Sequence, residues 1–416
     1  MRGMRITAAV AAAVLVLAAC GSGTTSGPKT LKIGFTASQT GAQELTSKRQ
    51  VEGIKLWADQ VAKAGGIKLK DGTVLTPQLV SYDDESKTDR VQALYTKLIN
   101  DDKVDFLLSP YSSGLIKAAA VVGEQNGKIM VTAGGADDAT MEQGFTSIYQ
   151  LYTPGSKYLT GAIDLMLAMD PTVKTIAIVN EKDAFSTGVA AAAKPYAESK
   201  GLTVVLNEGY DSGTTDFAPL VNKIAAAAPD AILGGGHFQD GQTLATALHD
   251  KQVAARFVAL LVAPPEPTFS AIGAAALGIV GPSQWEQSVK YDATTAAAAG
   301  ATWYGPAVAD FVTAYQTAYG AAPSYHSVGG YAAGLVLEKA IEDAGSIDAA
   351  AVRKALDALN LMTLFGQTQF STDTKTHGKQ TAHQMVYVQW QAAGDGLASQ
   401  VVWPVAVRTA PILPRQ

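Results

Sequence analysis

The sequence predicts an α/β fold made of two doubly wound parallel-sheet lobes. Short apolar segments alternate with amphipathic helical segments along most of the 416 residues, as in a parallel sheet covered by helices on both faces. The alternation comes in two blocks, roughly 31–150 and 151–280, which indicates two similar lobes. With 47% hydrophobic and 17% charged residues, the chain is too apolar to be disordered.

The first block predicts a run of strands and helices between residues 31 and 132. An apolar strand at Leu31–Phe35 precedes a polar loop and a helix in which Val51, Ile54, Ala58 and Val61 recur at helical spacing. We expect the next strands at 78–82, 104–108 and 129–132, with helices at 89–100 and 115–124 between them.

The second block repeats this rhythm, and a third region closes the chain. Strands are expected at 175–179, 203–206 and 231–233. One helix is expected to end at residue 200, and two further helices are expected over 220–226 and 243–249. Three further helices are expected at 308–319, 330–342 and 348–359. The segments 385–390 and 401–405 alternate like a strand pair with a turn at Gly394–Gly396, and the tail from Ala410 is expected to be unstructured.

The N-terminal segment is typical of a secretory signal peptide. Arg2 and Arg5 precede an apolar run, Ile6 to Ala19, that is too short for a transmembrane helix. Cys20 is the only cysteine of the chain, and Leu17-Ala18-Ala19-Cys20 resembles the bacterial lipobox, whose cysteine is lipidated and becomes the new N-terminus. We therefore expect a signal peptide over 1–19 and a flexible tether over 20–29. The product would be exported and anchored by lipid to the extracytoplasmic face of the cell membrane.

Composition and motif content argue against several classes of function. The net charge is −5, whereas a nucleic-acid binder needs a dominant basic surface. One cysteine allows neither an intramolecular disulfide nor a Cys-rich zinc site. The sequence has no metalloprotease, nucleophile-elbow or phosphate-loop motif, and its histidines have no close partner at metal-ligand spacing. We expect neither an enzyme nor a bound metal or cofactor.

Two loops of the first block offer uncharged hydrogen-bond donors. Ser109–Gly114 lies between a strand and a helix, and Thr132–Ala136 follows the neighbouring strand. Ligands of open α/β sheets bind beyond the carboxyl ends of the strands, where free N–H groups at a helix start attract a carboxylate. Ser112 and Ser113 would add hydroxyl groups, unless they only cap the helix. We expect one of them to cap the helix and the other to bind a ligand.

Several short motifs occur in the same order as in one known protein family. The family's opening strand and its loop resemble Lys32–Phe35 with Thr40-Gly41, and the end of the first helix resembles Ala64–Ile67. The end of the second strand resembles Tyr82–Ser86, and the start of a helix in the second lobe resembles Thr215–Leu220. Together with the lipobox, they make the chain similar to type I periplasmic binding proteins. The resemblance is strongest to the substrate-binding lipoproteins of the branched-chain amino acid transport family, and it extends over nearly the whole mature chain.

This family fold implies a hinge of three strands that cross between the lobes, near 149–152, 279–281 and 364–370. Lobe 1 would then contain 30–150 plus 282–363, and lobe 2 would contain 151–281 plus 364–409, followed by a tail at 410–416.

The resemblance also implies ligand contacts in the first lobe. Ser112 and Ser113 match the loop that holds the ligand carboxylate in this family. Gly134, Gly135 and Ala136 match the loop that follows, where relatives often have threonine at the position of Ala136.

In the second lobe the chain departs from the family pattern. Phe185 and Gly236 stand where relatives place aromatic residues, and Leu261 falls near the acidic residue that receives the ligand's amino group. Glu266 lies close enough in sequence to replace that acid, so the solute is expected either to lack an α-ammonium group or to pair it with Glu266. His237 and Trp285 are further candidates for this wall.

The function implied is that of the extracytoplasmic solute receptor of an ABC importer. It would bind an amino acid or a related carboxylate between its lobes, as a monomer, and present the closed form to a membrane permease. Two alternatives stay open, a ligand-sensing subunit that feeds a receptor and an exported hydrolase built on Ser113.

Overall fold

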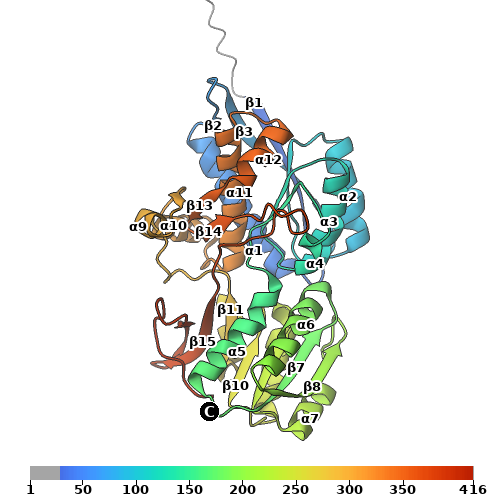
Figure 1. Ribbon diagram of the computed structural model, residues 1–416, viewed down its shortest axis with the longest axis vertical. Coiled ribbons are helices and arrows are strands. Elements are labelled where there is room, and N and C mark those ends of the chain that lie inside the picture. The colour runs from blue at the N-terminus through green and yellow to red at the C-terminus, as the bar shows by residue number, and fades with distance from the viewer. Residues whose placement is uncertain (1–28, 416) are drawn as a thin grey trace, which may run out of the picture.

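The computed structural model describes residues 29–415 and shows two lobes, one above the other (Figure 1). The predicted signal peptide, Cys20 and all but the last residue of the predicted tether lie outside the described residues. Within the described part of the chain, no helix combines the length and the apolar character needed to cross a bilayer.

Lobe 1, the upper lobe, is built on a six-stranded sheet of order β2-β3-β1-β4-β5-β6 (Figure 1). Only β2 runs antiparallel to its neighbour. The strands are β1 (Lys29–Ala37), β2 (Ile67–Lys68), β3 (Val74–Asp83), β4 (Phe106–Leu108), β5 (Met130–Thr132) and β6 (Ile148–Gln150). The helices are α1 (Glu44–Lys63), α2 (Thr88–Asn100), α3 (Ser113–Gln125) and α4 (Asp138–Met141). The parallel α/β lobe predicted from the first block is confirmed.

Lobe 2, the lower lobe, contains a seven-stranded sheet of order β16-β15-β11-β10-β9-β7-β8. Its strands are β7 (Thr175–Glu181), β8 (Thr203–Tyr210), β9 (Ala231–Gly235), β10 (Phe257–Leu260), β11 (Ile279–Ser283), β15 (Val386–Ala393) and β16 (Gly396–Trp403). Its helices are α5 (Tyr158–Met169), α6 (Ala184–Ser199), α7 (Ala218–Ala227), α8 (Phe238–Asp250) and the 3-10 segment η2 (Pro267–Ala276). The β15–β16 hairpin confirms the predicted strand pair and adds an antiparallel edge to a parallel sheet.

A third group of elements packs onto lobe 1. It contains the small sheet β12 (Thr302–Trp303), β13 (Asn360–Thr363) and β14 (Gly366–Gln369), and the helices α9 (Ala293–Ala298), α10 (Val308–Tyr319), α11 (Tyr325–Ala344) and α12 (Ala349–Asp357). Helix α11 lies against α1 so closely that a Cβ atom on Gly53 would stand 1.9 Å from the Ser327 carbonyl oxygen. A Cβ atom on Gly330 would stand 2.1 Å from the Gln50 carbonyl oxygen, so glycine permits this contact from both sides.

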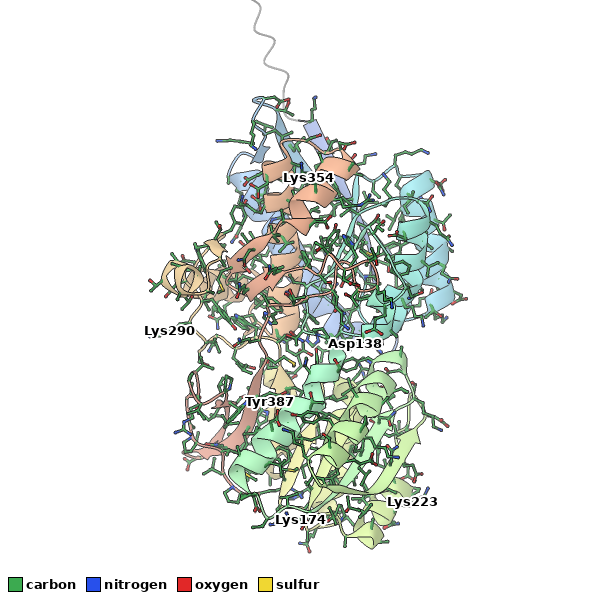
Figure 2. All side chains as sticks on the ribbon, in the orientation of Figure 1. Asp138, Lys174, Lys223, Lys290, Lys354 and Tyr387 are labelled. Atoms are coloured by element: carbon green, nitrogen blue, oxygen red, sulfur yellow. The ribbon has the colours of Figure 1, made fainter. Side chains whose placement is uncertain are left out.

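The chain passes between the lobes three times, after β6, after β11 and after β14. The third crossing differs from the prediction of 364–370, because β14 pairs with β13 and Phe370 bridges to Gln380 before the chain reaches β15. The ring of Phe370 packs 5.0 Å from that of Tyr149, which holds this segment on lobe 1. Asp138 lies at the boundary between the lobes (Figure 2). Its Oδ1 atom forms an ion pair with Lys379 Nζ at 2.6 Å.

The C-terminal tail is fixed to lobe 2, in contrast to the expectation that it is unstructured. The backbone of Leu413 accepts a hydrogen bond from Gln389 Nε2 at 2.8 Å and donates one to Gln389 Oε1 at 2.9 Å. Arg415 Nη1 donates to the Val253 carbonyl oxygen at 2.9 Å. Side-chain partners on a distant strand order this tail, and local sequence patterns do not reveal them.

Candidate functional site between the lobes

The candidate site is a small cavity where the loops that follow the strands of the two large sheets meet. It holds about 10 Å³, roughly the space of one water molecule, so an organic solute enters only if the lobes separate. We call it the solute cavity, and its lining residues are Tyr111, Ser112, Ser113, Gly134, Gly135, Ala136, Tyr152, Tyr158, Phe185, His237, Val262 and Tyr325.

The serine loop of lobe 1 precedes helix α3. Ser112 is the N-cap residue of α3, but its side chain makes no capping hydrogen bond. Ser113 Oγ accepts hydrogen bonds from the backbone N–H groups of Ala136 at 3.1 Å and Asp137 at 3.3 Å. The prediction that one serine caps the helix is therefore wrong, because Ser113 ties the serine loop to the next loop. The Ser112 hydroxyl and the first N–H groups of α3 remain available to a ligand.

Gly134 and Gly135 allow these two loops to pack together. A Cβ atom on Gly134 would lie 2.3 Å from Gln50 Oε1 and 2.4 Å from the Pro110 carbonyl oxygen. A Cβ atom on Gly135 would lie 2.9 Å from Ser113 Cα. Any side chain at these positions would push the loops apart, and this requirement explains the glycine pair that the sequence shows.

The wall contributed by lobe 2 includes Phe185 at the start of α6, Val262 after β10, and His237, the N-cap residue of α8. The rings of Phe185 and His237 are 6.0 Å apart, and all three side chains are more than nine-tenths buried. Across the cavity, Tyr111 Oη of lobe 1 lies 3.1 Å from His237 Nδ1, so the two lobes contact each other directly here.

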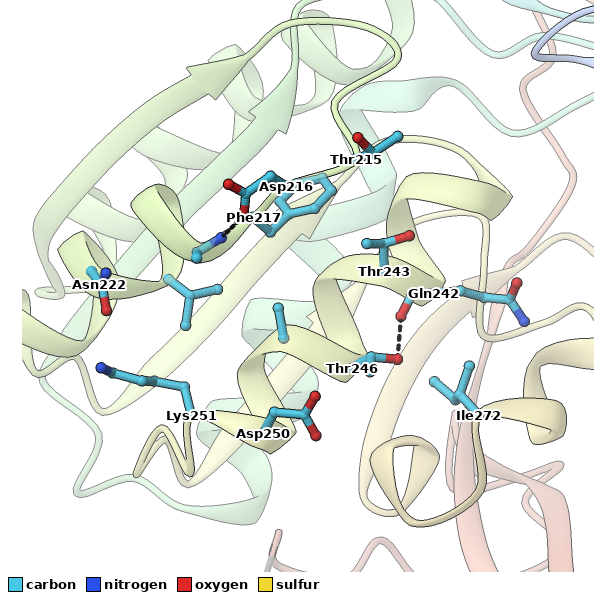
Figure 3. A pocket seen from close by; sticks show the side chains of 13 residues that line it. Thr215, Asp216, Phe217, Asn222, Gln242, Thr243, Thr246, Asp250, Lys251 and Ile272 are labelled. Carbon is cyan, nitrogen blue, oxygen red and sulfur yellow. Dashed lines mark hydrogen bonds between the residues drawn. The ribbon is translucent and has the colours of Figure 1, made fainter.

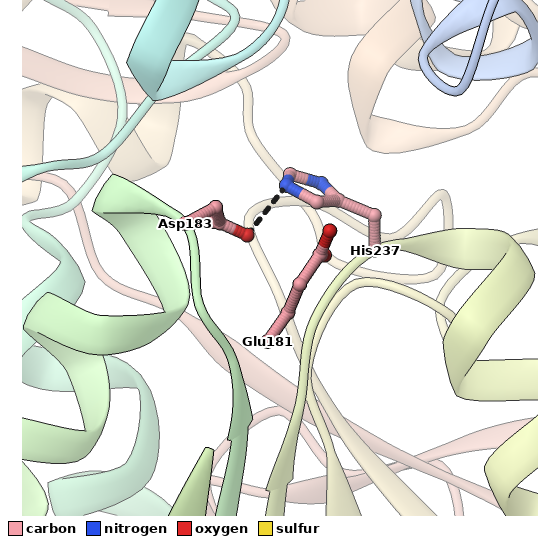
Figure 4. Close-up of side chains that lie close together, drawn as sticks. All are labelled: Glu181, Asp183 and His237. Atoms are coloured by element: carbon pink, nitrogen blue, oxygen red, sulfur yellow. Dashed lines mark ion pairs between the residues drawn. The ribbon is translucent and has the colours of Figure 1, made fainter. Parts of the chain in front are cut away.

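His237 lies next to three acidic side chains of lobe 2, and Figure 4 shows two of them, Glu181 and Asp183. Its Nε2 atom lies 3.2 Å from Asp183 Oδ2, and its backbone N–H donates to Asp240 Oδ1 at 2.7 Å. Glu181 reaches toward the same ring from the end of β7 (Figure 4). Gly236 makes room for this arrangement, because a Cβ atom there would lie 2.4 Å from Glu181 Oε2 and 2.5 Å from Asp240 Oδ2.

These contacts set the protonation states of the group. Burial lowers the pKa of His237, but the hydrogen bond and charge of Asp183, helped by Glu181 and Asp240, raise it overall to about 9. Burial raises the pKa of Glu181 to about 7. Burial also raises the pKa of Asp183, but the contacts of this carboxylate with His237 and Ser186 outweigh that effect and lower its pKa to about 2. At neutral pH His237 is therefore an imidazolium, and both of its ring N–H groups donate.

The same three residues have the geometry of a divalent-metal site. One ligand atom from each of Glu181, Asp183 and His237 lies within 4.8 Å of the others. A metal would have to displace the proton that the three acids stabilise on His237, because a metal ligand must be deprotonated. At neutral pH the imidazolium itself supplies the positive charge that these carboxylates require.

Aromatic rings make up half of the lining of the solute cavity. Tyr158 and Phe185 pack edge to face at 5.2 Å, and Tyr152 and Tyr325 at 5.7 Å. Tyr158 Oη accepts from Gln284 Nε2 at 2.7 Å, so its own O–H group can donate to a ligand. The hydroxyl of Tyr152 is buried without a hydrogen-bond partner among the described residues.

A family model described as "Periplasmic binding protein" matches residues 30–395. The chain belongs to this family.

Comparison with known proteins assigns this periplasmic binding protein to the branched-chain amino acid ABC transporter group. Its fold is the type I fold of that group. The Leu/Ile/Val-binding protein BraC3 of Rhizobium johnstonii is 28% identical over 87% of this chain and 92% of its own length. Among solved structures, the substrate-binding protein LivJ of Streptococcus pneumoniae in complex with isoleucine has a TM-score of 0.73 at 20% identity, over 90% of this chain and all of LivJ. A solute-binding protein of R. palustris in complex with 4-hydroxybenzoate has a TM-score of 0.74 at 20% identity, over 92% of this chain and 98% of its own.

Seven of the ten predicted ligand-binding residues line the solute cavity of the binding protein: Ser112, Ser113, Gly134, Gly135, Ala136, Phe185 and His237. The other three lie elsewhere. Gly236 sits behind His237 against the acidic side chains, and Trp285 donates from Nε1 to the Leu364 carbonyl oxygen at 2.8 Å. Glu266 is fully buried and is not among the residues that line the cavity.

Glu266 instead joins the lobes at a second point. Its Oε1 atom lies 2.6 Å from Nδ1 of His326 on α11, and neither side chain has exposed surface. Burial lowers the pKa of His326, although Glu266 opposes that effect, so the ring is neutral near pH 7 and donates through Nδ1. Glu266 thus has a structural partner in lobe 1, and its pairing with the ammonium group of a solute stays a prediction.

Sequence reasoning missed the four tyrosines of the solute cavity. Tyr111 belongs to the serine loop and could have been included with it, and Tyr152 ends the first predicted crossing strand. Tyr325 begins α11, whose start was placed five residues too late by the apolar periodicity. No local signal distinguishes Tyr158 from a core residue.

A larger groove of about 810 Å³ lies on lobe 2 alone, between α7 and α8 (Figure 3). Its lining includes Phe217, Val221, Thr246 and Lys251. A solute bound there would contact only one lobe and could not stabilise closure, so its size does not make it the solute site.

Proposed function

We propose that this binding protein is the lipid-anchored, extracytoplasmic solute receptor of an ABC importer and that it delivers a carboxylate solute to a membrane permease. The supporting observation is that the solute cavity is lined by both lobes. Ser112 and Tyr111 come from lobe 1, whereas Phe185, His237 and Val262 come from lobe 2. A solute that contacts both walls favours the closed arrangement, and closure is the signal that a receptor of this kind presents to its transporter.

The anchor for the carboxylate is the N-terminus of α3. The Ser112 hydroxyl and the first N–H groups of this helix converge beside the Gly134-Gly135 loop, and Tyr158 can donate from the neighbouring wall. The imidazolium of His237 adds positive charge on the opposite side. Neutral donors on one wall and a cation on the other suit an anionic group.

The rest of the cavity suits an aromatic ring rather than an α-ammonium group. Six of the twelve lining residues are aromatic or imidazole rings, and none of the twelve is acidic. An ammonium group would lose its hydration without gaining a carboxylate partner and would face the imidazolium of His237. The complex of the R. palustris relative with 4-hydroxybenzoate supports an aromatic carboxylate. Isoleucine in LivJ supports an α-amino acid as the competing solute.

Titration calorimetry of benzoate, 4-hydroxybenzoate, isoleucine and phenylglycine tests the proposal. We expect the two benzoates to bind more tightly than either amino acid. Ser112→Ala should weaken benzoate binding by about 1.5–3 kcal/mol, the typical value of a hydrogen bond to a charged group. Ser199→Ala, which removes an exposed hydroxyl at the end of α6, is the matched control and should bind benzoate like the wild type. If none of these carboxylates binds, or if Ser112→Ala binds benzoate like the wild type, the assigned site is wrong.

A further inference from the structure

A second cavity lies between the lobes, and Tyr325 separates it from the solute cavity, because this residue lines both. We call it the hinge cavity. It holds about 440 Å³ and is lined by eighteen residues: Pro265, Pro267, Ser270, Trp285, Glu286, Gln287, Ser288, Ala322, Pro323, Ser324, Tyr325, Trp390, Leu397, Ala398, Ser399, Gln400, Val401 and Thr409. Residues 322–325 lead into α11 of lobe 1, residues 285–288 belong to the second crossing, and the other lining residues belong to lobe 2.

The hinge cavity has one ionisable side chain besides a tyrosine hydroxyl, and that side chain is an acid. Glu286 is its only acidic lining residue, and no lysine, arginine or histidine is among the eighteen. Burial raises the pKa of Glu286 to about 8, the nearby charge of Glu266 adds to this effect, and Ser283 opposes it. The charged group that acts on Glu286 is therefore a second acid, itself held by neutral His326.

The solute cavity has the opposite character. Apart from the tyrosine hydroxyl groups, its lining has one titratable side chain, that of His237. None of its lining residues is acidic. A cation that the imidazolium of His237 repels would find a counter-ion in the hinge cavity once Glu286 loses its proton, although the two cavities share Tyr325.

The walls around Glu286 add a second feature. Trp285, Tyr325 and Trp390 bring three aromatic side chains to the hinge cavity, together with three prolines. Aromatic rings attract cations through their quadrupole, and apolar walls next to a carboxylate suit an alkylated ammonium better than a hydrated metal ion. Bound at Glu286, such a cation would satisfy a carboxyl group that burial otherwise keeps protonated.

We propose that the hinge cavity binds a small organic ammonium ion, with Glu286 as its counter-ion and the neighbouring aromatic side chains as its walls. This site is separate from the solute cavity in position and in charge preference. Because residues of both lobes line it, an occupant there contacts the moving parts of the protein directly.

Calorimetry with tetramethylammonium, which carries a permanent charge, tests the proposal on the full mature chain. The neutral molecule tert-butanol has a similar size and serves as the control ligand. We expect tetramethylammonium to bind at least tenfold more tightly than tert-butanol, and Glu286→Gln to lose at least tenfold in tetramethylammonium affinity. Glu198→Gln removes an exposed carboxylate of α6 outside the cavity and should leave the affinity unchanged.

Two additional measurements keep the result interpretable. Benzoate binding by Glu286→Gln shows that this variant is folded, since Glu286 does not line the solute cavity. Ser399→Lys places a positive charge in the hinge cavity without touching Glu286 and should also weaken tetramethylammonium binding at least tenfold. Equal binding of tetramethylammonium and tert-butanol, or unchanged tetramethylammonium affinity in either cavity variant, would overturn the proposal.

Discussion

The pairing of His237 with Asp183 predicts a specific dependence of stability on pH. A histidine pKa that rises from its ordinary value of 6.5 to about 9 on folding stabilises the folded state by about 3 kcal/mol. Because the folded pKa is raised, this contribution is fully present below 6.5 and is lost as the pH rises through 9. The lowered pKa of Asp183 describes the same contact, so the energy is counted once.

Asp183→Asn removes the charge and keeps the local geometry. Asp183 caps α6 by accepting hydrogen bonds from Ser186 N at 2.8 Å and Ser186 Oγ at 2.9 Å, and asparagine is an equally good N-cap residue. The pKa of His237 should fall, with Glu181 and Asp240 retaining a smaller part of the effect. We expect the variant to lose about 2–3 kcal/mol near pH 6 and almost nothing near pH 10.

Urea denaturation at these two pH values measures the difference, and an NMR titration of the His237 ring measures the pKa directly. The control is Asp211→Asn, which breaks an ion pair between Asp211 and Lys182. The side chain of Asp211 is 82% exposed and that of Lys182 is 58% exposed. It should cost less than about 1 kcal/mol at either pH. If the stability of the wild type and of Asp183→Asn falls equally between these pH values, the imidazolium assignment of His237 is refuted.

Three more predictions concern the anchor, the glycine behind His237 and the buried acid. Cys20→Ser should move the protein from the detergent phase to the aqueous phase without changing its thermal unfolding, and equal partitioning of both proteins would contradict the lipid anchor. Gly236→Ala should destabilise the protein by about 1–3 kcal/mol, because its Cβ atom would overlap two carboxylates, whereas Gly396→Ala, whose nearest neighbour is 3.9 Å away, should be close to neutral in thermal denaturation. An equal loss in the two glycine variants would disprove the overlap argument. Glu266→Gln should change the affinities for benzoate and phenylglycine by the same factor in calorimetry, and a loss confined to phenylglycine would show that Glu266 pairs with its ammonium group.

The fold was predictable because its main signal is local. Each lobe is a series of apolar strands and amphipathic helices, and the predicted helix 308–319 coincides with α10. The third crossing and the tail were not predictable, since long-range contacts fix both. Phe370 stays on lobe 1 through Tyr149, and Leu413 stays on lobe 2 through Gln389.

The candidate site was predictable on the lobe 1 side for a similar reason. Loops at the carboxyl ends of neighbouring parallel strands must meet, so the serine and glycine loops could be grouped from the order of the strands. Proximity in sequence gave no such guidance for Glu266 and Trp285, which are buried and do not line the solute cavity. Tyr325 lies over two hundred positions from Tyr111, and only the packing of α11 brings them to one cavity.

The packing of α11 against α1 also affects when the chain can fold. Trp57 on α1 donates to Glu338 on α11 at 2.7 Å, across a separation of 281 residues. The hydrophobic core of lobe 1 is therefore incomplete until the last third of the polypeptide is present, whereas β7 to β11 of lobe 2 form one uninterrupted stretch. Contacts between such distant segments form slowly. In the exported protein that we propose, this delay would leave lobe 1 unfinished while the chain crosses the membrane.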